Sequence, residues 1–210
     1  RYLAIDKYEN IWVSHPYHGV YRVYKNSGNS YSSKLYDNKS GLPFTLNNHV
    51  FKVKNRVLVA TEKGIYEYNP KKDIFEPEQN YKKILGEQSL RYIKEDTQGN
   101  IWFVHEKSIG VIDYSNKEPK VIFIPELTNK LLSGFEFIYP VNQNNIFIGG
   151  EKGFIHLNYE KYKQNISTIP VRIRLVSINN NKDSIIFGGY FNNINNTSIQ
   201  EKGNSFKINY

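Results

Sequence analysis

Four short polar segments carry most of the side chains in this sequence that could bind a ligand. The first, His15-Pro16-Tyr17-His18, places two imidazoles beside a phenol, and each of the other three contains a glutamate followed by a lysine. An aromatic ring suits the face of a sugar, and imidazole nitrogens suit its hydroxyl groups. The candidate ligand-binding residues are His15, Tyr17, His18, Glu62, Lys63, His105, Glu106, Lys107, Glu151 and Lys152.

Each candidate also has a structural interpretation. Exposed Glu-Lys pairs are common in turns and add little to stability, and we favour this interpretation for any single pair. His15 and His105 both follow a tryptophan by three residues, and this repetition favours a structural position at a strand end. For Tyr17 and His18 the sequence favours neither interpretation.

Catalysis and metal binding have little support in the sequence. Asp6 and Asp96 recur with turns, where a carboxylate accepts backbone N–H bonds, and do not form the carboxylate pair that a glycosidase needs. His49 and His156 lie in expected strands without metal-ligand spacing, and there is no cysteine. We therefore predict no catalytic residue, metal or cofactor, with a propeller lyase or hydrolase as an open alternative.

The charge of the chain is positive but dispersed. Lys+Arg number 28 against Asp+Glu 20, a formal net charge of +8, and the lysines are scattered through turns. A solvated surface is the preferred interpretation, attraction to acidic ligands the alternative, and nucleic acid is not an expected partner. No apolar run reaches membrane length. Because the chain starts at Arg1 in mid-strand and lacks methionine, we expect its true N-terminus upstream.

A repeat of about 45 residues positions the candidate residues. Large residues recur at intervals of 46, 44 and 45 (Trp12, Leu58, Trp102 and Phe147), and glycines that open the next strand recur at intervals of 45, 46 and 43 (Gly19, Gly64, Gly110 and Gly153). Several short strands in each repeat of this length predict an all-β fold made of β-propeller blades. We expect four blades, at about 1–45, 46–88, 89–134 and 135–169.

The expected strands follow from runs of β-branched and aromatic residues. They are 2–5, 11–14, 19–24 and 33–36; 49–53, 57–60, 64–68 and 74–76; 90–95, 101–104, 110–114 and 121–124; and 135–139, 146–149 and 154–158. The fourth blade has no obvious outermost strand, and the only helix-like segments are short, such as 129–133 and 159–164.

The composition changes after residue 158. A polar stretch, 159–169, precedes an alternating apolar segment at 171–178. We place a domain boundary near Ile169, although 171–178 could instead close the fourth blade.

Two of the repeats carry a family resemblance. The segments Ile93-Lys94-Glu95-Asp96 through Asp113-Tyr114 and Ala4-Ile5-Asp6 through Tyr24, with the turn Ser40-Gly41-Leu42-Pro43, resemble the two-component-regulator propeller repeat of bacterial sensor proteins. The segment 170–210 resembles the start of the triple-tyrosine domain, an immunoglobulin-like β-sandwich. Together the two resemblances cover nearly the whole chain.

The resemblance implies a function and a setting. These four blades would be the last part of a seven-bladed propeller, and 170–210 an incomplete β-sandwich domain. The chain would be the non-enzymatic, periplasmic or extracytoplasmic sensing region of a signal-transduction or transcription-regulating receptor. It would recognise an oligosaccharide and signal to a membrane-linked output. The implied partners are a small soluble ligand, the remaining blades, the output domain and a second copy in a homodimer, and a protein-interaction scaffold is the alternative function.

Blade geometry places the candidate residues on one face. Because successive strands alternate in direction, the turns between second and third strands lie on the same face as the links between blades. The links 42–48 and 132–134 therefore join the four polar segments at the expected entrance face of the propeller.

Overall fold

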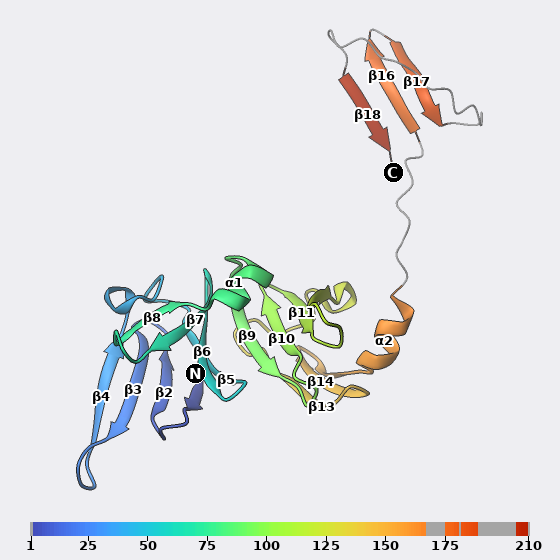
Figure 1. The fold of residues 1–210 in the computed structure, drawn as a ribbon. Coiled ribbons are helices and arrows are strands. Elements are labelled where there is room, and N and C mark those ends of the chain that lie inside the picture. Colours follow the sequence, from blue (N-terminus) through green and yellow to red (C-terminus); the bar gives the residue numbers. More distant parts are fainter. Residues whose placement is uncertain (1, 167–174, 181, 189–204, 210) are drawn as a thin grey trace. The chain divides into compact units, whose positions relative to one another are not determined.

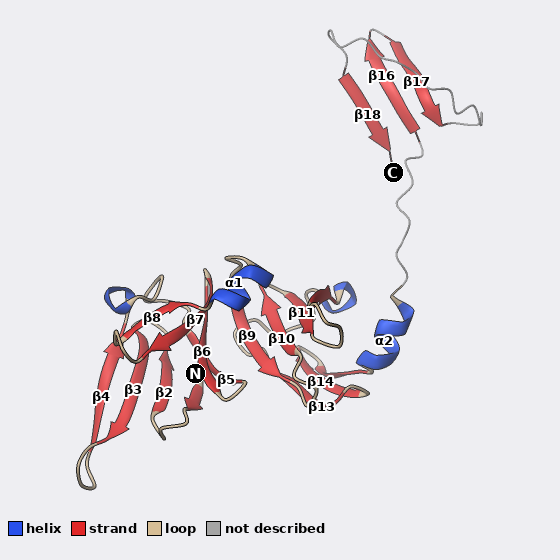
Figure 2. Cartoon of the chain, viewed as in Figure 1, coloured by secondary structure: helices blue, strands red, loops and turns tan. Residues whose placement is uncertain are grey.

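The computed structural model describes residues 2–166, 175–180, 182–188 and 205–209. The chain divides into two compact units, Arg1–Gln164 and Asn165–Tyr210. The first unit holds four antiparallel sheets and the second holds one (Figures 1 and 2). No helix among the described residues is long and apolar enough to cross a membrane.

The four sheets of the first unit are the blades of a β-propeller, as predicted. Blade 1 contains β1 (Leu3–Ile5), β2 (Ile11–His15), β3 (Gly19–Lys25) and β4 (Tyr31–Tyr36), followed by the short helix η1 (Asn38–Ser40). Blade 2 contains β5 (His49–Val53), β6 (Arg56–Thr61), β7 (Gly64–Asn69) and β8 (Ile74–Pro77), followed by α1 (Gln79–Leu85). Blade 3 contains β9 (Leu90–Glu95), β10 (Ile101–His105), β11 (Ser108–Asp113) and β12 (Lys120–Phe123), followed by η2 (Pro125–Leu127). Blade 4 contains β13 (Ile138–Asn142), β14 (Asn145–Gly150) and β15 (Gly153–Leu157), followed by α2 (Tyr159–Asn165).

Each blade is a simple meander in which neighbouring strands in the chain pair with one another. The first strands of successive blades lie in contact, β1 with β5, β5 with β9, and β9 with β13. This arrangement makes β1, β5, β9 and β13 the inner strands. It also puts the turns between second and third strands at the same edge as the links between blades, as the sequence predicts.

The two tryptophans are core residues that pack between blades. Trp12 and Trp102 are 1% and 0% exposed. The Trp12 ring contacts Tyr68 and Phe75 of blade 2, with ring centroids 4.9 and 5.6 Å apart. Burial of one such side chain stabilises the fold by about 3 kcal/mol, so Trp12 holds blades 1 and 2 together.

One of the four repeated glycines has a different role from the one predicted. The third strand begins opposite the end of the second, in the pairs His15↔Gly19 and His105↔Ser108. Gly19 has a φ of +102°, which glycine adopts readily. Gly110 instead lies inside β11 opposite Phe103, where an added Cβ would come within 2.3 Å of the Phe103 ring. Ser108 therefore opens this strand, and the glycine at 110 makes room for an aromatic ring.

Two further expectations are wrong. The strand expected at 135–139 begins at Ile138, after the turn at Gly134 with its φ of +81°. The segment 129–133 is not helical, because the N–H of Asn129 donates to the carbonyl of Lys107. The segment thus ties the β10–β11 turn to its surroundings.

The helix predictions also missed one element. The helix α1 has Glu78 as its N-cap, whose side chain accepts from the N–H of Tyr81 at 2.8 Å. Tyr81 and Leu85 are buried one turn apart, and Gly86 ends the helix. The expected helical segment at 159–164 is confirmed by α2.

The second unit contains β16 (Leu175–Asn180), β17 (Lys182–Gly188) and β18 (Ser205–Asn209), in the order β17-β16-β18. Because β16 pairs with β17 and β18, residues 175–178 do not close blade 4. The boundary expected near residue 169, and much of the predicted β-sandwich, lie outside the described residues.

Candidate ligand-binding clefts

The first polar segment forms the β2–β3 turn at the entrance face. His15 Nδ1 accepts from the backbone N–H of Tyr17 at 3.2 Å, and the ring centroids of His15 and His18 lie 4.4 Å apart. Tyr17 is 69% exposed. The contact with the Tyr17 N–H orients the His15 ring within the turn.

A cleft of about 190 Å³ lies beside this turn. Its lining residues come from the end of β2, the turn and the link to blade 2: Ser14, His15, Pro16, Tyr17, Asn47, Asn48 and His49. Asn48 is 2% exposed, and its Nδ2 donates to the carbonyl of Phe44 at 2.8 Å. Its Oδ1 is buried and makes no hydrogen bond. Asn48 is thus fixed by its bond to Phe44 at the inner wall of the cleft.

A second cleft, of about 160 Å³, shares Asn47 and His49 with the first. Its other lining residues are Glu62, Ser89, Leu90, Arg91, Ser133, Gly134 and Glu136. They come from the β6–β7 turn and the links into blades 3 and 4. The adjoining clefts therefore join two of the four polar segments through the links.

The polar groups of the second cleft are held in place by hydrogen bonds. Asn47 Nδ2 donates to Glu62 Oε1 at 2.5 Å, and Arg91 Nη1 donates to Ser133 Oγ at 2.7 Å. Glu136 is 5% exposed and accepts from the backbone N–H of Gly134 at 2.9 Å. These hydrogen bonds fix the orientation of the polar side chains that line the second cleft.

Only His15, Tyr17 and Glu62 of these lining residues were candidates from the sequence. Asn47 and Asn48 belong to the link 42–48, which the sequence places on this face. Their amides could therefore have been identified as candidate binding groups from the sequence. Arg91 and Glu136 flank apolar strand segments, and nothing in their sequence context distinguishes them from ordinary surface charges.

The other candidates on this face do not line either cleft. His105 is half-buried, and its Nδ1 lies 2.8 Å from the carbonyl oxygen of Ser89, in agreement with the structural interpretation. His18 lies beside His15. Exposed turn residues make up the rest: Lys63, Glu106, Lys107, Glu151 and Lys152. Within the described residues, none of the three Glu-Lys pairs forms an ion pair.

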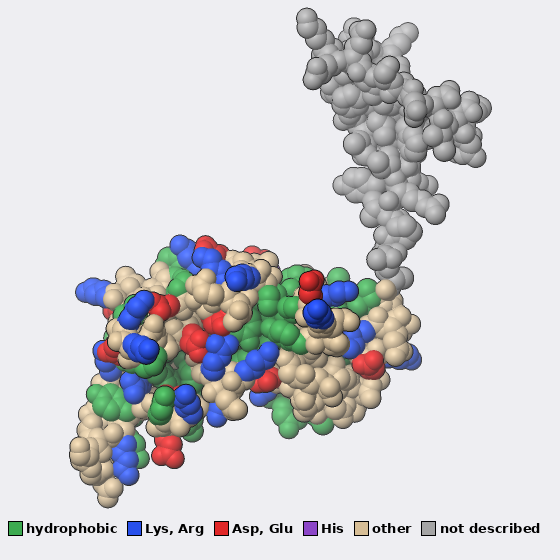
Figure 3. Space-filling model, viewed as in Figure 1, with side chains coloured by type: hydrophobic (Ala, Val, Ile, Leu, Met, Phe, Trp, Pro, Cys, Tyr) green, Lys and Arg blue, Asp and Glu red, His purple; other side chains and the backbone are tan. Residues whose placement is uncertain are grey.

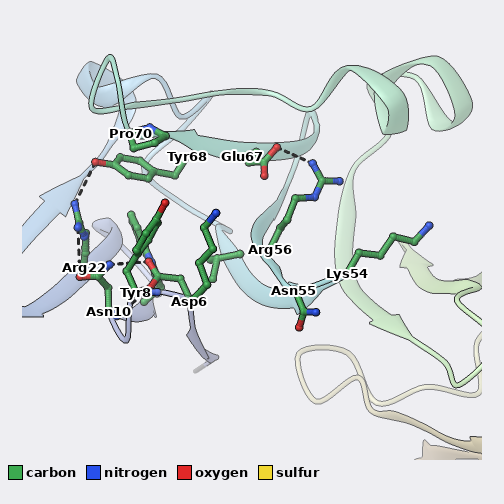
Figure 4. Close-up of a pocket in the computed structure, with 13 residues that line it drawn as sticks. Asp6, Tyr8, Asn10, Arg22, Lys54, Asn55, Arg56, Glu67, Tyr68 and Pro70 are labelled. Carbon is green, nitrogen blue, oxygen red and sulfur yellow. Dashed lines mark hydrogen bonds and ion pairs between the residues drawn. The ribbon is translucent and has the colours of Figure 1, made fainter.

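A larger cleft, of about 740 Å³, opens between blades 1 and 2 on the opposite face (Figure 4). It adjoins the β1–β2, β5–β6 and β7–β8 turns, which lie at the other edge of the blades from the β2–β3 turn. The lining residues are Asp6, Lys7, Tyr8, Asn10, Trp12, Arg22, Lys54, Asn55, Arg56, Val57, Glu67, Tyr68 and Pro70. The ten candidate residues from the sequence are all absent from this lining.

Asp6 is a structural carboxylate in this cleft, as the sequence predicts. Its Oδ1 accepts from the N–H groups of Tyr8 and Asn10 at 2.8 and 2.9 Å. Its Oδ2 accepts from Asn10 Nδ2 and Trp12 Nε1, also at 2.8 and 2.9 Å. Burial opposes ionisation, but these four donors outweigh it and hold the pKa of Asp6 below its ordinary value.

Arg56 is paired with two carboxylates. Its Nη1 lies 2.8 Å from Glu67 Oε2 and 3.1 Å from Glu78 Oε1. Burial raises the pKa of Glu67 in spite of this guanidinium. For Glu78 the effect of burial is outweighed by hydrogen bonds from the Tyr81 N–H and Arg56, so the pKa lies below its ordinary value.

Arg22 is different, because within the described residues it forms no ion pair. Its Nη1 donates to the Tyr68 hydroxyl at 3.2 Å and its Nη2 to Asn10 Oδ1 at 3.3 Å, while its Nε is buried without a hydrogen bond (Figure 4). Burial opposes the charge, but the oxygens of Tyr36, Tyr68 and Asp6 outweigh it and raise the pKa of Arg22. The cleft therefore keeps a guanidinium that is charged but unpaired.

The face of the molecule shown in Figure 3 has no single basic patch among the described residues. On the face shown in Figure 3, lysine and arginine side chains lie scattered among hydrophobic and neutral ones. Among the described residues, no group of three or more histidine, cysteine, aspartate or glutamate side chains is placed to hold a metal ion. The positive charges on this face are thus dispersed. Whether a given cationic side chain can bind a ligand depends on the ion pairs it already makes.

Comparison with known proteins defines the class of fold. No protein-family model matches the chain, and no curated protein matches it. The extracellular domain of a protein assigned as a hybrid two-component system of B. thetaiotaomicron aligns over 99% of this chain, with a TM-score of 0.57 and 17% identity. A second extracellular domain from that organism, of a protein assigned as a one-component system, aligns over 76%, with a TM-score of 0.53 and 17% identity.

These structural neighbours share the propeller fold with the chain and agree with the family resemblance of its repeats. The chain spans 29% and 22% of the lengths of those two proteins. Virginiamycin B lyase from Staphylococcus aureus also aligns, at 16% identity over 74% of this chain and 54% of that one, but its TM-score of 0.40 is too low to carry an argument.

Proposed function

We propose that this chain is an extracytoplasmic sensing region of a bacterial signal-transduction receptor, and that its entrance-face clefts bind an oligosaccharide. The observation that carries the proposal is the pair of adjoining clefts, one of which places the side chains of Asn47 and Asn48 beside the exposed ring of Tyr17. The assignment of the structural neighbours as extracellular domains of sensor systems supports the cellular setting.

The chemistry of the clefts suits a neutral or weakly polar sugar. Tyr17 offers a ring face, while His15, Asn47 and Asn48 offer donors and acceptors from one short stretch of surface. Binding without turnover is the proposed activity. The bound state would be passed through the second unit to the membrane-linked output.

Calorimetric titration of the chain with neutral oligosaccharides tests this proposal. Tyr17→Ala removes the stacking surface, so we expect binding about five- to tenfold weaker, equivalent to about 1 kcal/mol. Tyr31→Ala is the matched control, because Tyr31 is also exposed (65%) but lies at the start of β4, away from both clefts. Equal affinity of wild type and Tyr17→Ala, or release of a cleavage product, would overturn the proposal.

A second candidate function, protein recognition, is favoured by the outer face of blade 4. Tyr139 and Phe154 are more than half exposed on it, and the exposed Phe137, just before β13, has its ring parallel to that of Tyr139. Apolar sheet faces of this size mark interaction surfaces.

We propose that further blades of the same protein cover this face, because the opposite face of blade 4 buries Ile138, Ile146 and Ile148 in the core shared with blade 3. A longer chain with added blades should then be monomeric and melt at a higher temperature. A dimer of this chain that loses its stability in Phe137→Ser would instead assign the face to a second copy.

A further inference from the structure

The cleft between blades 1 and 2 is unused by the proposed function. It lies on the opposite face from the entrance clefts, and its volume of about 740 Å³ is within the range of small-molecule sites, about 300–1,000 Å³. Its wall combines the flat rings of Tyr8 and Tyr68 with several cationic side chains. The charges and contacts of these groups indicate what the cleft can bind.

The cations that line the cleft outnumber its carboxylates: Lys7, Arg22, Lys54 and Arg56 stand against Asp6 and Glu67. Asp6 accepts four hydrogen bonds, and Glu67 is bound by Arg56. Three cations remain without a carboxylate partner in the described part of the chain: Arg22, Lys7 and Lys54. The nitrogen atoms of the two lysines lie over rings, 5.0 Å from the centroid of Tyr8 and 3.9 Å from that of Tyr114. The cleft therefore carries an excess of positive charge that can attract an anionic ligand.

Arg22 is not explained by packing. It lies opposite Trp12 in the β2–β3 pair, and the equivalent position in blade 3, opposite Trp102, is Val111. Val111 is fully buried and serves the same fold without any charge. The guanidinium of Arg22 lies among aromatic rings and donates only to two neutral oxygens, so it keeps hydrogen-bond donors for a further acceptor.

The aromatic rings supply the second half of a site. Tyr8 is 67% exposed, and Tyr68 is half-buried with its hydroxyl on Arg22 (Figure 4). The Arg22 guanidinium carbon lies 5.5 Å from the centre of the Tyr68 ring and 5.7 Å from that of Trp12. A planar cation beside ring faces suits a carboxylate attached to a ring, because the charge pairs with the guanidinium while the ring stacks.

We propose that the cleft between blades 1 and 2 binds an anionic ring ligand of the uronic-acid class, with Arg22 as the residue that pairs with its carboxylate. Lys7 and Lys54 add long-range attraction from the rim, and Tyr8 and Tyr68 provide the stacking surface. This site is separate from the entrance clefts, so it stands or falls independently of the proposed oligosaccharide site.

The two tryptophans provide a built-in reporter for the test. Trp12 Nε1 donates to Asp6 Oδ2 at 2.9 Å within the cleft, whereas Trp102 Nε1 donates to Asp96 Oδ2 at 3.1 Å in the core of blade 3. In ¹⁵N-labelled full chain, titration with glucuronate should shift the Trp12 indole resonance and leave that of Trp102 in place. Glucose supplies the ring without the charge, and acetate supplies the charge without the ring, so both should bind more weakly.

Two variants assign the effect to Arg22. Arg22→Val installs the residue that blade 3 uses, so the chain should fold, and glucuronate binding should weaken about tenfold or more through the lost charge-assisted bond. Lys25→Gln is the matched control on the same strand, β3, since it removes one exposed positive charge away from the cleft. Its affinity for glucuronate should match that of wild type.

The outcomes separate this site from the entrance clefts. A Trp12 shift that is lost in Arg22→Val but kept in Tyr17→Ala supports the proposal. Absence of a Trp12 shift, equal binding of glucose and glucuronate, or unchanged binding in folded Arg22→Val overturns it. Should Arg22→Val fail to fold, Lys54→Gln is the second variant, with an expected twofold to threefold loss, and unchanged affinity there overturns the proposal as well.

Discussion

Blades 1 and 3 contain the same corner, built twice from an aspartate, an asparagine and a tryptophan. In both, the aspartate accepts from two backbone N–H groups, the asparagine amide and the indole. In blade 3, Gln143 of blade 4 adds a fifth donor to Asp96 at 2.7 Å, and Asp96 is 6% exposed. In blade 1 the corner stays open, and Asp6 is half-buried at the wall of the large cleft.

The two corners share a scaffold that the repeat provides. The neighbouring blade determines whether the corner is buried in the core or lines a cleft. Where the next blade sends Gln143 across, the corner is closed into the core. Where it presents Lys54, Asn55 and Tyr68, a cleft remains. The residue opposite the tryptophan follows the same division, with Val111 in the closed corner and Arg22 in the open one.

The sharpest test of this contrast exchanges the residues opposite the two tryptophans. Val111→Arg would bury an unpaired guanidinium at a fully buried position, and we expect a loss of about 4 kcal/mol or more, enough to unfold blade 3. Arg22→Val should change the free energy of unfolding by less than about 1 kcal/mol, because the charge it removes has no ion-pair partner. Urea denaturation measures both, and equal losses would show that the two corners are equivalent.

A smaller contrast is expected for the two aspartates. In Asp96→Asn, the side-chain oxygen that accepts from Trp102 and Gln143 is replaced by an NH₂ group, which can only donate. Because the site is buried, we expect a loss of about 3 kcal/mol in the free energy of unfolding. Asp6→Asn makes the same change where water can enter, and about 1–2 kcal/mol is expected. Thermal unfolding with both variants ranks them, and a larger loss for Asp6→Asn would contradict the open-corner account.

The smallest effect is a pH dependence of the open corner. The folded pKa of Asp6 lies below its ordinary value, so its carboxylate stabilises the fold above the unfolded pKa of about 3.9, and this contribution is lost as the pH falls through the folded pKa. The difference in stability between wild type and Asp6→Asn should therefore shrink as the pH falls below about 4. Denaturant melts at neutral and acidic pH provide the measurement, and a difference that grows on acidification would refute the assignment.

Much of the fold could be read from the sequence because it rests on local patterns. The strands β5 and β9 were predicted at their observed bounds, since β-branched and aromatic runs end there at turn residues. Gly110 was misassigned because its role depends on the ring of Phe103 on the neighbouring strand. Its spacing alone resembled that of a turn glycine.

The clefts were only partly predictable, and for a similar reason. The entrance face follows from strand alternation, so Tyr17 and Glu62 could be placed near the links. The large cleft depends on Arg22 meeting Tyr68 from the next blade, and on which carboxylates are already bound. Side-chain pairing across blades leaves no trace in a single sequence, so this site could be found only in the structure.

The most direct test of the sensing proposal is a thermal-shift screen of the full chain against neutral and acidic oligosaccharides, with product analysis of each mixture. A ligand that binds the native state raises the melting temperature by mass action. We expect the melting temperature to rise with a limited class of sugars and to rise less in Tyr17→Ala. We expect no cleavage product. No shift across a broad panel, or a shift accompanied by hydrolysis, would contradict it.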